Sequence, residues 1–289
     1  MSRSPVTVAE TLQQAVAQLG KGLDSSSPRL DAEVLLAHVQ NWTRTELHCR
    51  ITDPLPDSQR TQFLRLLEER VRGVPVAYLV GYKEFYSRRF WVCPGVLVPR
   101  PETELLVERS LVELRRTPGP ARILDLCCGS GCIAITLCLE TLGTTAVATD
   151  ISETAVRQTL ENVKFFAVEE RIRVTQSDLF SALSKEAFDL IVSNPPYVGT
   201  DFGPKADANV AAHEPALALY SGPDGMEHLK NIVRNAPAHL IEGGSLVVEC
   251  ASFQAERVEA WMDEMGFNQT CLWHDLGGLP RGVSGRWEG

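Results

Sequence analysis

The sequence predicts an α/β fold in which helices cover both faces of a sheet, preceded by a small helical bundle and a β-hairpin linker. Three observations predict this organisation. From residue 121 onward, short apolar runs alternate with segments of helical length, as in successive strand–helix units. Residues 6–72 show only the helical period, whereas residues 76–98 are rich in aromatic and β-branched residues. We therefore expect three parts, which are residues 1–75, 76–99 and 100–289.

The composition is that of an ordinary globular protein of 289 residues, with 44% hydrophobic and 22% charged residues. The 28 Lys and Arg residues against 37 Asp and Glu give a net charge of -9. An acidic chain is poorly suited to neutralising phosphates, so we expect a protein or small-molecule partner and no stable nucleic-acid complex. No apolar run approaches the roughly 18 residues needed to span a bilayer, so we expect no membrane association.

The eight cysteines are expected to be reduced thiols in the cytoplasm, because no secretory segment is evident. Four of them crowd together at Cys127, Cys128, Cys132 and Cys138. Their spacing lacks the C-x2-C pairs that are common in zinc sites. We interpret them as small core residues and expect no bound metal.

Residues 1–75 are expected to form a helical domain. Apolar residues recur at helical spacing along Val8–Leu19, Leu30–His38 and Phe63–Val71. Ser27-Pro28 is typical of a helix start, since proline is favoured in the first turn. The apolar face of this bundle could hold a partner or only its own core.

Residues 76–99 are expected to form a hairpin with its turn at Ser87-Arg88-Arg89. Arg100-Pro101-Glu102-Thr103 then opens a helix that extends through Glu113, and Pro118-Gly119-Pro120 breaks it. Beyond this point we expect strands at 122–127, 145–150, 172–178, 188–193 and 245–250, with weaker strands near 271–273 and 283–287. Helices are expected at 133–142, 153–168, 226–240 and 256–265.

Acidic residues and glycines stand where these strands end. Gly129 and Gly131 allow a tight turn between the first strand and its helix, where a ligand can approach free backbone N–H groups. Asp125, Asp150 and Asp178 belong to three successive strand ends, so they would converge on one crevice at the edge of the sheet. Each acid alone could instead be a helix cap or a turn residue.

The fourth of these strands ends in Asn194-Pro195-Pro196-Tyr197. Two consecutive prolines fix the backbone, which aims the amide and the aromatic ring that frame them. A dinucleotide site has to be weighed, because Gly129-x-Gly131-x-x-Ala134 fits a relaxed dinucleotide-binding fingerprint. A hydride-transfer site, however, has no evident need for a strand that ends in Asn-Pro-Pro-Tyr.

Together these motifs resemble the class I S-adenosylmethionine-dependent methyltransferases, and more narrowly the HemK/PrmC family. That family methylates the glutamine of the Gly-Gly-Gln motif in peptide-chain release factors. The resemblance covers nearly the whole chain and rests on Pro99–Glu104, the glycine turn, Ser177–Phe180, Ser193–Val198 and Glu214–Leu219. It implies a seven-stranded Rossmann-like sheet, S-adenosyl-L-methionine as cofactor, and methyl transfer to the glutamine side-chain nitrogen (N5). Class 1 release factors are the implied partners, and we expect a monomer.

The resemblance also implies which residues hold the cofactor. They are Asp125, Cys127, Gly129, Gly131, Asp150, Ile151, Asp178, Leu179 and Asn194. Asp150 would hold the ribose and Asp178 the adenine amino group. Cys127 departs from the family, which usually has glycine at this position of the turn. A Cβ makes a positive φ costly there, so we expect a reshaped but working pocket.

Asn194, Pro195 and Tyr197 are the expected catalytic residues. The Asn194 side-chain oxygen and the Pro195 carbonyl would accept the two hydrogens of a planar –NH2 group, while Tyr197 would wall the pocket. Substrate binding would add Pro196, Arg100 and Glu102 to these three residues. The segment around Arg100 could equally be a helix N-terminus with favourable acids.

Two other functions stay open. The same clamp fits the amino group of adenine, so an adenine-N6 methyltransferase acting on DNA or RNA is the main alternative. The other is a non-catalytic protein that binds the cofactor, which only Cys127 supports. The acidic composition and the helical N-terminal part favour a protein substrate.

Overall fold

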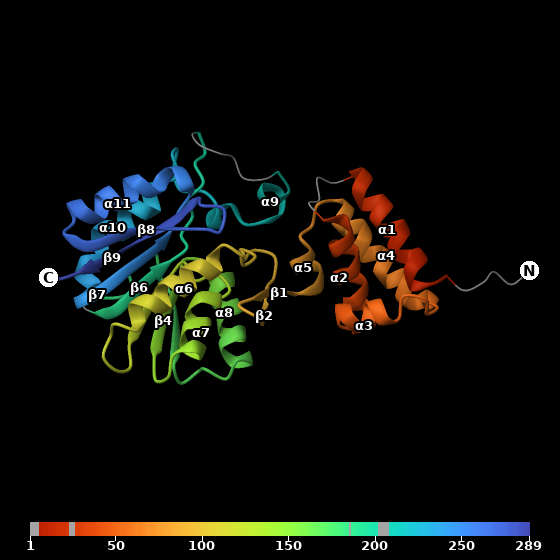
Figure 1. The fold of residues 1–289 in the computed structure, drawn as a ribbon, viewed down its shortest axis with the longest axis horizontal. Coiled ribbons are helices and arrows are strands. Elements are labelled where there is room, and N and C mark those ends of the chain that lie inside the picture. Colours follow the sequence, from red (N-terminus) through yellow and green to blue (C-terminus); the bar gives the residue numbers. More distant parts are fainter. Residues whose placement is uncertain (1–5, 23–26, 185, 202–207) are drawn as a thin grey trace, which may run out of the picture. The chain divides into compact units, whose positions relative to one another are not determined.

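The computed structural model describes residues 6–22, 27–184, 186–201 and 208–289 (Figure 1). Residues 1–5, which bear on the expectation about a secretory segment, lie outside the described residues. The chain divides into two compact units. The first comprises the residues up to Tyr82 together with 208–213, and the second comprises residues 83–207 and 214–289.

The first unit is helical, as the sequence predicts. Its helices are α1 (Val8–Gly22), α2 (Pro28–Gln40), α3 (Arg44–Cys49), α4 (Asp57–Val71), α5 (Val76–Val80) and α9 (Ala208–His213). Pro28 is in the first turn of α2, and Thr43 and Glu46 form a capping box at the start of α3. The predicted apolar stripes of α1, α2 and α4 pack on one another around the buried side chain of Phe63. These stripes therefore form a core of the bundle itself.

The hairpin is shorter than predicted. Residues 76–80 form the helix α5 and not a strand, because Pro75 begins this helical turn and Gly81, at φ 82°, ends it. These signals outweigh the strand preference of the β-branched valines. The hairpin consists of β1 (Tyr82–Phe85) and β2 (Arg88–Trp91). Its turn is Tyr86-Ser87, both at positive φ as a two-residue hairpin loop requires, so the turn predicted at 87–89 is one residue too late.

A sheet of seven strands forms the centre of the second unit, and the predicted α/β class is confirmed. The strands are β3 (Arg122–Leu126), β4 (Thr145–Asp150), β5 (Ile172–Gln176), β6 (Phe188–Ser193), β7 (Leu240–Glu249), β8 (Phe267–His274) and β9 (Pro280–Trp287). Their order is β5-β4-β3-β6-β7-β9-β8. The first five are parallel, β9 pairs antiparallel with β7, and β8 pairs antiparallel with β9. The carboxyl ends of β3 to β7 therefore lie at one edge of the sheet.

Helices cover both faces of this sheet (Figure 1). One face packs on α6 (Thr103–Leu114), α7 (Cys132–Glu140) and α8 (Glu153–Phe165). The other face packs on α10 (Glu227–Asn235) and α11 (Ala255–Glu264). Ile123 and Leu124 of β3 contribute to opposite cores, as expected for neighbouring residues of a strand buried on both faces.

Several predicted boundaries differ from the observed ones. The helix expected over 226–240 ends at Asn235, because Pro237 cannot continue an α-helix and a 3-10 turn follows. Strand β7 consequently begins at Leu240 instead of residue 245. β3 ends before Cys127 and β5 before Asp178, so these two residues belong to the loops after the strands. Among the described helices, none is both long and apolar enough to cross a membrane.

Candidate active site

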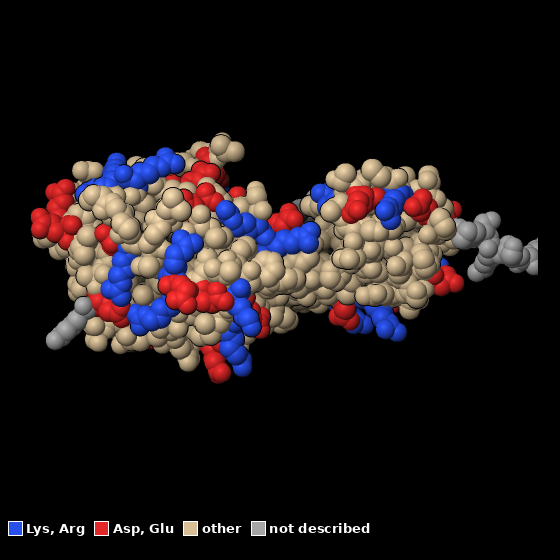
Figure 2. All heavy atoms as spheres, turned by 90° about the horizontal axis from the view of Figure 1, so that it is seen from below, with Lys and Arg blue, Asp and Glu red and all other residues tan. Residues whose placement is uncertain are grey.

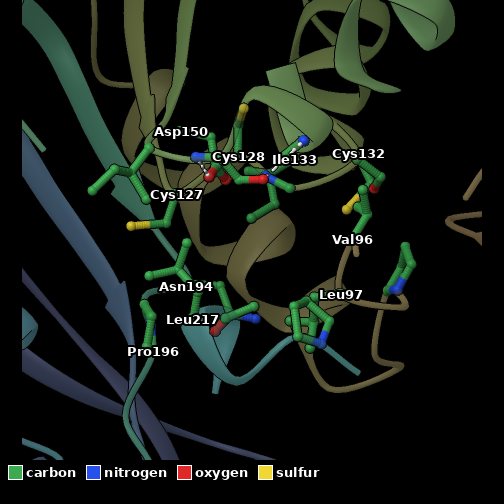
Figure 3. A pocket seen from close by; sticks show the side chains of 18 of the residues that line it. Val96, Leu97, Cys127, Cys128, Cys132, Ile133, Asp150, Asn194, Pro196 and Leu217 are labelled. Carbon is green, nitrogen blue, oxygen red and sulfur yellow. Dashed lines mark hydrogen bonds between the residues drawn. The ribbon is translucent and has the colours of Figure 1, made fainter. Parts of the chain in front are cut away.

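A pocket opens at the carboxyl edge of the sheet, within the second unit. It is lined by the loops that follow β3, β4, β5 and β6, together with residues 95–100 and 215–218. Figure 3 shows Cys127, Asp150 and Asn194 on one side of this pocket, opposite Val96 and Leu97. Of the residues predicted for the site, the lining includes Arg100, Cys127, Gly129, Asp150, Ile151, Asp178, Leu179, Asn194 and Pro196. Asp125, Gly131, Pro195, Tyr197 and Glu102 are not part of that lining.

The turn between β3 and α7 is left-handed at three positions, with φ of 59° at Cys127, 57° at Gly129 and 77° at Gly131. A Cβ on Gly131 would lie 2.7 Å from the Thr159 methyl carbon of α8, so only glycine fits there. Nothing lies within 4 Å of where a Cβ on Gly129 would be, so the space beside it is open. Cys127 adopts the conformation that favours glycine, as the departure from the family pattern predicts.

Asn162 of α8 anchors this turn. Its side-chain nitrogen donates to the Ser130 carbonyl at 2.8 Å and to the Trp91 carbonyl at 2.9 Å, and its oxygen accepts from the Trp91 N–H at 2.9 Å. Thr159, one turn earlier, donates to the Gly129 carbonyl at 3.0 Å. One buried helix face therefore holds both the hairpin and the glycine turn in place.

The cysteine cluster separates into two kinds of residue. Cys128, Cys132 and Cys138 have buried side chains within the core between α6, α7 and the sheet, which confirms their interpretation as core residues. Cys128 and Cys132 also border the pocket. Cys127 is not a core residue, because its side chain is only partly buried and lines the pocket. Burial still raises the pKa of its thiol well above the ordinary range.

Asp125 lies beneath the glycine turn. One carboxyl oxygen accepts the N–H of Ala134 at 3.0 Å, and the other has no hydrogen-bond partner among the described residues. Burial raises the pKa of this carboxyl to about 8, against the opposing effect of the Ala134 N–H. Asp125 thus supports the first turn of α7 from behind through a single hydrogen bond, as far as the described residues show.

Asp150 and Asp178 differ in how firmly they are held. The two carboxyl oxygens of Asp150 accept the N–H groups of Gly129 and Ser152, each at 2.9 Å. Burial raises the pKa of Asp150, and these N–H groups oppose that rise. Asp178 is exposed at the rim, next to Leu179 at φ 46°. Asp150 therefore combines the predicted pocket position with a turn-stabilising contact, whereas the Asp178 side chain is accessible from the pocket.

The Asn-Pro-Pro-Tyr segment follows β6, whose last residue, Ser193, donates to the Leu126 carbonyl at 2.8 Å. The Asn194 side-chain nitrogen donates to the hydroxyl of Thr103, the first residue of α6, at 3.0 Å. Tyr197 does not wall the pocket as predicted, because its hydroxyl donates to a Glu249 carboxyl oxygen at 3.1 Å. Its carbonyl accepts from the side chain of Gln254 at 2.9 Å. The segment is thus fixed at both ends, with Asn194 at the pocket.

Besides Thr103, three acidic or polar residues at or beside the site were missed by sequence reasoning. Glu214, 5% exposed, accepts the Val98 N–H at 3.1 Å and forms a 2.7 Å ion pair with Arg100. Glu249 is buried at the end of β7, and burial raises its pKa to about 7. The third, His228, lines the pocket with its Nδ1 2.6 Å from the Ser221 hydroxyl.

Only weak signals could have found these residues. Glu214 begins the Glu-Pro-Ala-Leu-Ala-Leu segment, which marks the resemblance without indicating a role. Glu249 ends a central strand in the same way as Asp150, and a search for acids at every strand end would have included it. His228 has no local pattern around it. Glu102, by contrast, is exposed just before α6 and outside the pocket lining.

Comparison with known proteins identifies both parts of the chain. Residues 10–81 match the PrmC N-terminal domain, and residues 102–212 match the methyltransferase small domain. The release factor glutamine methyltransferase of Salmonella typhimurium is 40% identical over 96% of this chain and 97% of its own length. The enzyme of the same name from Cereibacter sphaeroides is 38% identical over 96% of this chain and 98% of its own length.

Two solved structures share the fold over most of this chain. The T. thermophilus 16S rRNA N2 G1207 methyltransferase RsmC, in complex with AdoMet and guanosine, has a TM-score of 0.53 at 20% identity, over 71% of this chain and 49% of that chain. The hMettl16 catalytic domain has a TM-score of 0.55 at 14% identity, over 80% of this chain and 82% of that chain. The class I methyltransferase fold is thereby confirmed, and by its near full-length sequence relatives the chain belongs to the release factor glutamine methyltransferase family.

Proposed function

We propose that this protein transfers the methyl group of S-adenosylmethionine to the side-chain nitrogen (N5) of the glutamine in the Gly-Gly-Gln motif of class 1 peptide-chain release factors. Family membership supports the reaction, and the chain covers 97% and 98% of the length of two relatives named release factor glutamine methyltransferase. One observation carries the proposal at the site. The side-chain nitrogen of Asn194 donates a hydrogen bond to the Thr103 hydroxyl, so the side-chain oxygen of Asn194 can accept a hydrogen bond from an incoming –NH2 group.

The pocket suits S-adenosylmethionine. The open space beside Gly129 lets a ligand approach the turn before α7, as such turns allow. The carboxyl oxygens of Asp150 each have a lone pair beyond the N–H contact they already make, so they can also accept from ribose hydroxyls. Asp178 and Leu179 would face the adenine, and Ile151, 45% exposed, would pack on it. When bound, S-adenosylmethionine supplies a methyl group made electrophilic by a positively charged sulfur.

The chain's own contribution to catalysis is alignment. A carboxamide nitrogen is a poor nucleophile because its lone pair is delocalised into the carbonyl. The Asn194 oxygen and the Pro195 carbonyl accept the two amide hydrogens and turn the nitrogen toward the methyl donor. Holding reactants in one geometry in this way can supply a large share of a rate enhancement. Pro196 and Arg100 border the same pocket and limit the room for the substrate side chain.

Tyr197 acts from outside the pocket. Its hydroxyl and carbonyl are both committed to neighbours, so it holds the Asn-Pro-Pro-Tyr backbone in place. The Arg100–Glu214 ion pair likewise joins the segment at Val98 to the loop that begins at Glu214. Glu102 would contact the substrate protein from the exposed start of α6.

We further propose a division of labour between the parts of the chain. Residues 1–75 would recognise the release factor, residues 76–99 would connect, and residues 100–289 would carry out the transfer, in a cytoplasmic monomer. The net charge of -9 argues against stable binding to nucleic acid. On the face drawn in Figure 2, Lys and Arg side chains are interspersed with Asp and Glu, which also favours a protein partner.

A labelling assay tests the proposal. The purified protein is incubated with radiolabelled S-adenosylmethionine and a class 1 release factor, its Gly-Gly-Gln glutamine→Ala variant, DNA or RNA. Label on the wild-type release factor alone is the expected result. Label on nucleic acid would favour the adenine alternative, and cofactor binding without label on any substrate would favour the non-catalytic one.

A further inference from the structure

The turn between β3 and α7 contains a backbone donor that is left without a partner. Gly129 and Ser130 are the central residues of this turn, which is closed by the Gly131 N–H donating to the Cys128 carbonyl at 2.7 Å. The N–H of Ser130 has no hydrogen-bond partner within the described part of the chain. Ser130 is only 2% exposed, yet it lines the pocket. Buried N–H groups are nearly always paired, so this one indicates that a ligand in the pocket supplies the acceptor.

Two buried side chains of α8 hold the carbonyl groups on either side of this donor. The Thr159 hydroxyl donates to the Gly129 carbonyl at 3.0 Å, and the Asn162 side-chain nitrogen donates to the Ser130 carbonyl at 2.8 Å. Thr159 and Asn162 are both 0% exposed, so bulk water does not compete for these carbonyls. The Cys128 sulfur lies 3.4 Å from the Thr159 oxygen. Because the Thr159 hydrogen is on the Gly129 carbonyl, the thiol is the donor of this contact.

The direction of the Ser130 N–H follows from the position of the Gly129 carbonyl, because the two belong to one peptide group. A trans peptide group is planar, and its C=O and N–H point in opposite directions. The carbonyl is directed at Thr159, so the N–H is directed away from Thr159. Ser130 lines the pocket, whereas Thr159 is not part of that lining. The N–H is therefore on the pocket side of the turn, next to the open space beside Gly129.

The central peptide group of such a turn can face either way. Turn types that share the same closing hydrogen bond differ by a rotation of this group, which moves its carbonyl to the other side. Gly129 has no Cβ to oppose the rotation. The Thr159 hydroxyl does oppose it, since the rotated carbonyl would lose its donor and the N–H would take its place beside Thr159. One hydroxyl of α8 thus decides whether the turn offers a donor or an acceptor to the pocket.

We propose that Thr159 is a positioning residue for the cofactor: its hydroxyl keeps the Ser130 N–H turned toward the pocket, where this N–H donates to the carboxylate of S-adenosylmethionine. The inference rests on the proposed function only for the identity of the ligand. In the proposed binding mode the ribose lies at Asp150 and the adenine at Asp178, which leaves the methionine part for the turn. A carboxylate is the strongest acceptor in that part, and the N-terminus of α7 directly after the turn favours a negative charge.

Binding measurements on the full-length protein test this role with two ligands. S-adenosylhomocysteine carries the carboxylate, whereas 5′-methylthioadenosine keeps the adenosine and the sulfur but lacks the carboxylate. Thr159→Val preserves the shape of the side chain and removes its hydroxyl. We expect the Kd for S-adenosylhomocysteine to rise roughly 10-fold in this variant, which is the loss of a hydrogen bond to a charged group. The Kd for 5′-methylthioadenosine should stay unchanged. Thr159→Ser keeps the hydroxyl and should bind both ligands as the wild type does.

Thr136→Val is the matched control. Thr136 is a 0% exposed residue of α7 outside the pocket lining, and its hydroxyl has no hydrogen-bond partner among the described residues. The same chemical change is thus made in a neighbouring helix, and the Kd values of both ligands should stay unchanged. A purely structural role of Thr159 predicts instead that Thr159→Val weakens both ligands equally. That result, or a normal Kd for S-adenosylhomocysteine in Thr159→Val, would overturn the proposal.

A second measurement uses the wild-type protein and does not depend on the folding of a variant. The backbone amide signal of Ser130, observed by 15N NMR, should shift when S-adenosylhomocysteine is added and stay in place when 5′-methylthioadenosine is added. An equal response to the two ligands would show that the N–H does not contact the carboxylate and would overturn the proposal. A wild type that binds S-adenosylhomocysteine in this way but methylates no release factor would contradict the proposed function and leave the role of Thr159 standing.

Discussion

At the scale of single residues, the site depends on side chains whose two ends have different partners. Asn194 has one end on Thr103 and the other toward the pocket, and Asp150 accepts two backbone N–H groups while bordering the same space. These hydrogen bonds orient both side chains before any ligand binds. Preorganised polar groups of this kind are most effective at a reacting centre, because no reorganisation is needed during the reaction.

Asn194→Ala should therefore remove the activity and leave the fold and the cofactor site in place. Loss of one pre-aimed polar partner costs on the order of 10²–10³ in rate. Asn194→Asp keeps an acceptor oxygen and should retain more activity than Ala. Single-turnover rates on folded enzyme measure the effect, with the Kd for S-adenosylmethionine as control. A near-normal rate for Asn194→Ala would rule out the amide clamp.

The Cys127 position should accept glycine and reject a β-branched residue. At φ 59° a Cβ is costly, so Cys127→Gly should leave the free energy of unfolding unchanged or raise it by up to about 1 kcal/mol. Cys127→Val should lower it, since a β-branched residue at positive φ is a genuine outlier. Denaturant unfolding compares the two variants. Equal loss of stability in both would mean that the thiol itself supports the turn.

Asp125 should make stability fall as the pH rises. Its pKa is about 8 in the folded protein and 3.8 when unperturbed, so the folded state holds the proton more tightly. The stabilisation is complete below about pH 4 and is lost as the pH approaches 8. Each pKa unit corresponds to about 1.4 kcal/mol of free energy. Between pH 5 and 8 the free energy of unfolding of Asp125→Asn should therefore rise by a few kcal/mol relative to that of the wild type. Urea unfolding of the wild type and of Asp125→Asn at pH 5 and pH 8 tests this prediction. A stability difference between the two proteins that does not change with pH would contradict it.

At the scale of elements, the strand–helix units were predictable because the central strands β3, β4 and β6 are mostly buried, which makes them continuous apolar runs, and helices of similar length follow β3 and β4. The strands at 145–150 and 188–193 were predicted to the residue. The start of the hairpin was predicted too early. Val76 and Val80 have strand propensity, and only Pro75 and Gly81 indicate that this segment forms the helix α5. Local propensity is a weaker determinant than the capping residues on either side.

The site itself was predictable where one local motif supplies the contacts. Gly129 of the glycine turn, Asp150 and Asn194 all line the pocket, where the sequence placed them. Thr103 lines the pocket from a segment far away in the sequence, and Glu214 contacts the lining residue Arg100 from another. No spacing connects either of them to Asn194. Tyr197, predicted to wall the pocket, is not among the residues that line it, and the partner of its hydroxyl, Glu249, is 52 residues further along the chain.

The packing of the glycine turn on α8 predicts a specific clash. Gly131→Ala would bring a Cβ to 2.7 Å from the Thr159 methyl carbon, in addition to the cost of a positive φ. Gly129→Ala meets only the φ cost, roughly 1–2 kcal/mol, because the space beside it is open. Gly131→Ala should thus lower the free energy of unfolding more than Gly129→Ala, and Thr159→Ser, which lacks the methyl group, should reduce the difference. Equal effects of the two alanines would contradict the clash.

At the scale of the whole molecule, the first family match agrees with the N-terminal segment of the first unit. The PrmC N-terminal domain match ends at residue 81, and that segment ends at Tyr82, with residues 208–213 joining the same unit from further along the chain. Each unit has a buried core of its own. All residues that line the pocket belong to the second unit, so cofactor binding and recognition of the substrate protein can be tested separately.

A chain that begins at residue 83 should bind S-adenosylmethionine with an affinity close to that of the full chain. Its methylation of an intact release factor should fall strongly, since residues 1–75 are proposed to hold that partner. Calorimetry and the labelling assay measure the two properties side by side. Full activity of the shortened chain on the intact factor would make the helical unit dispensable for recognition.

The cysteine in the pocket also affects the chemical durability of the enzyme. Alkylating agents and peroxide attack the thiolate form, and the raised pKa of the Cys127 thiol keeps it protonated at neutral pH. Cys128 and Cys132 beside it are buried, and the pKa of Cys132 is raised to about 12. A sulfur-rich wall around a sulfonium cofactor would otherwise be an obvious target for oxidation. In this protein the three thiols at the pocket should be slow to react, and the exposed Cys49 should be modified before them.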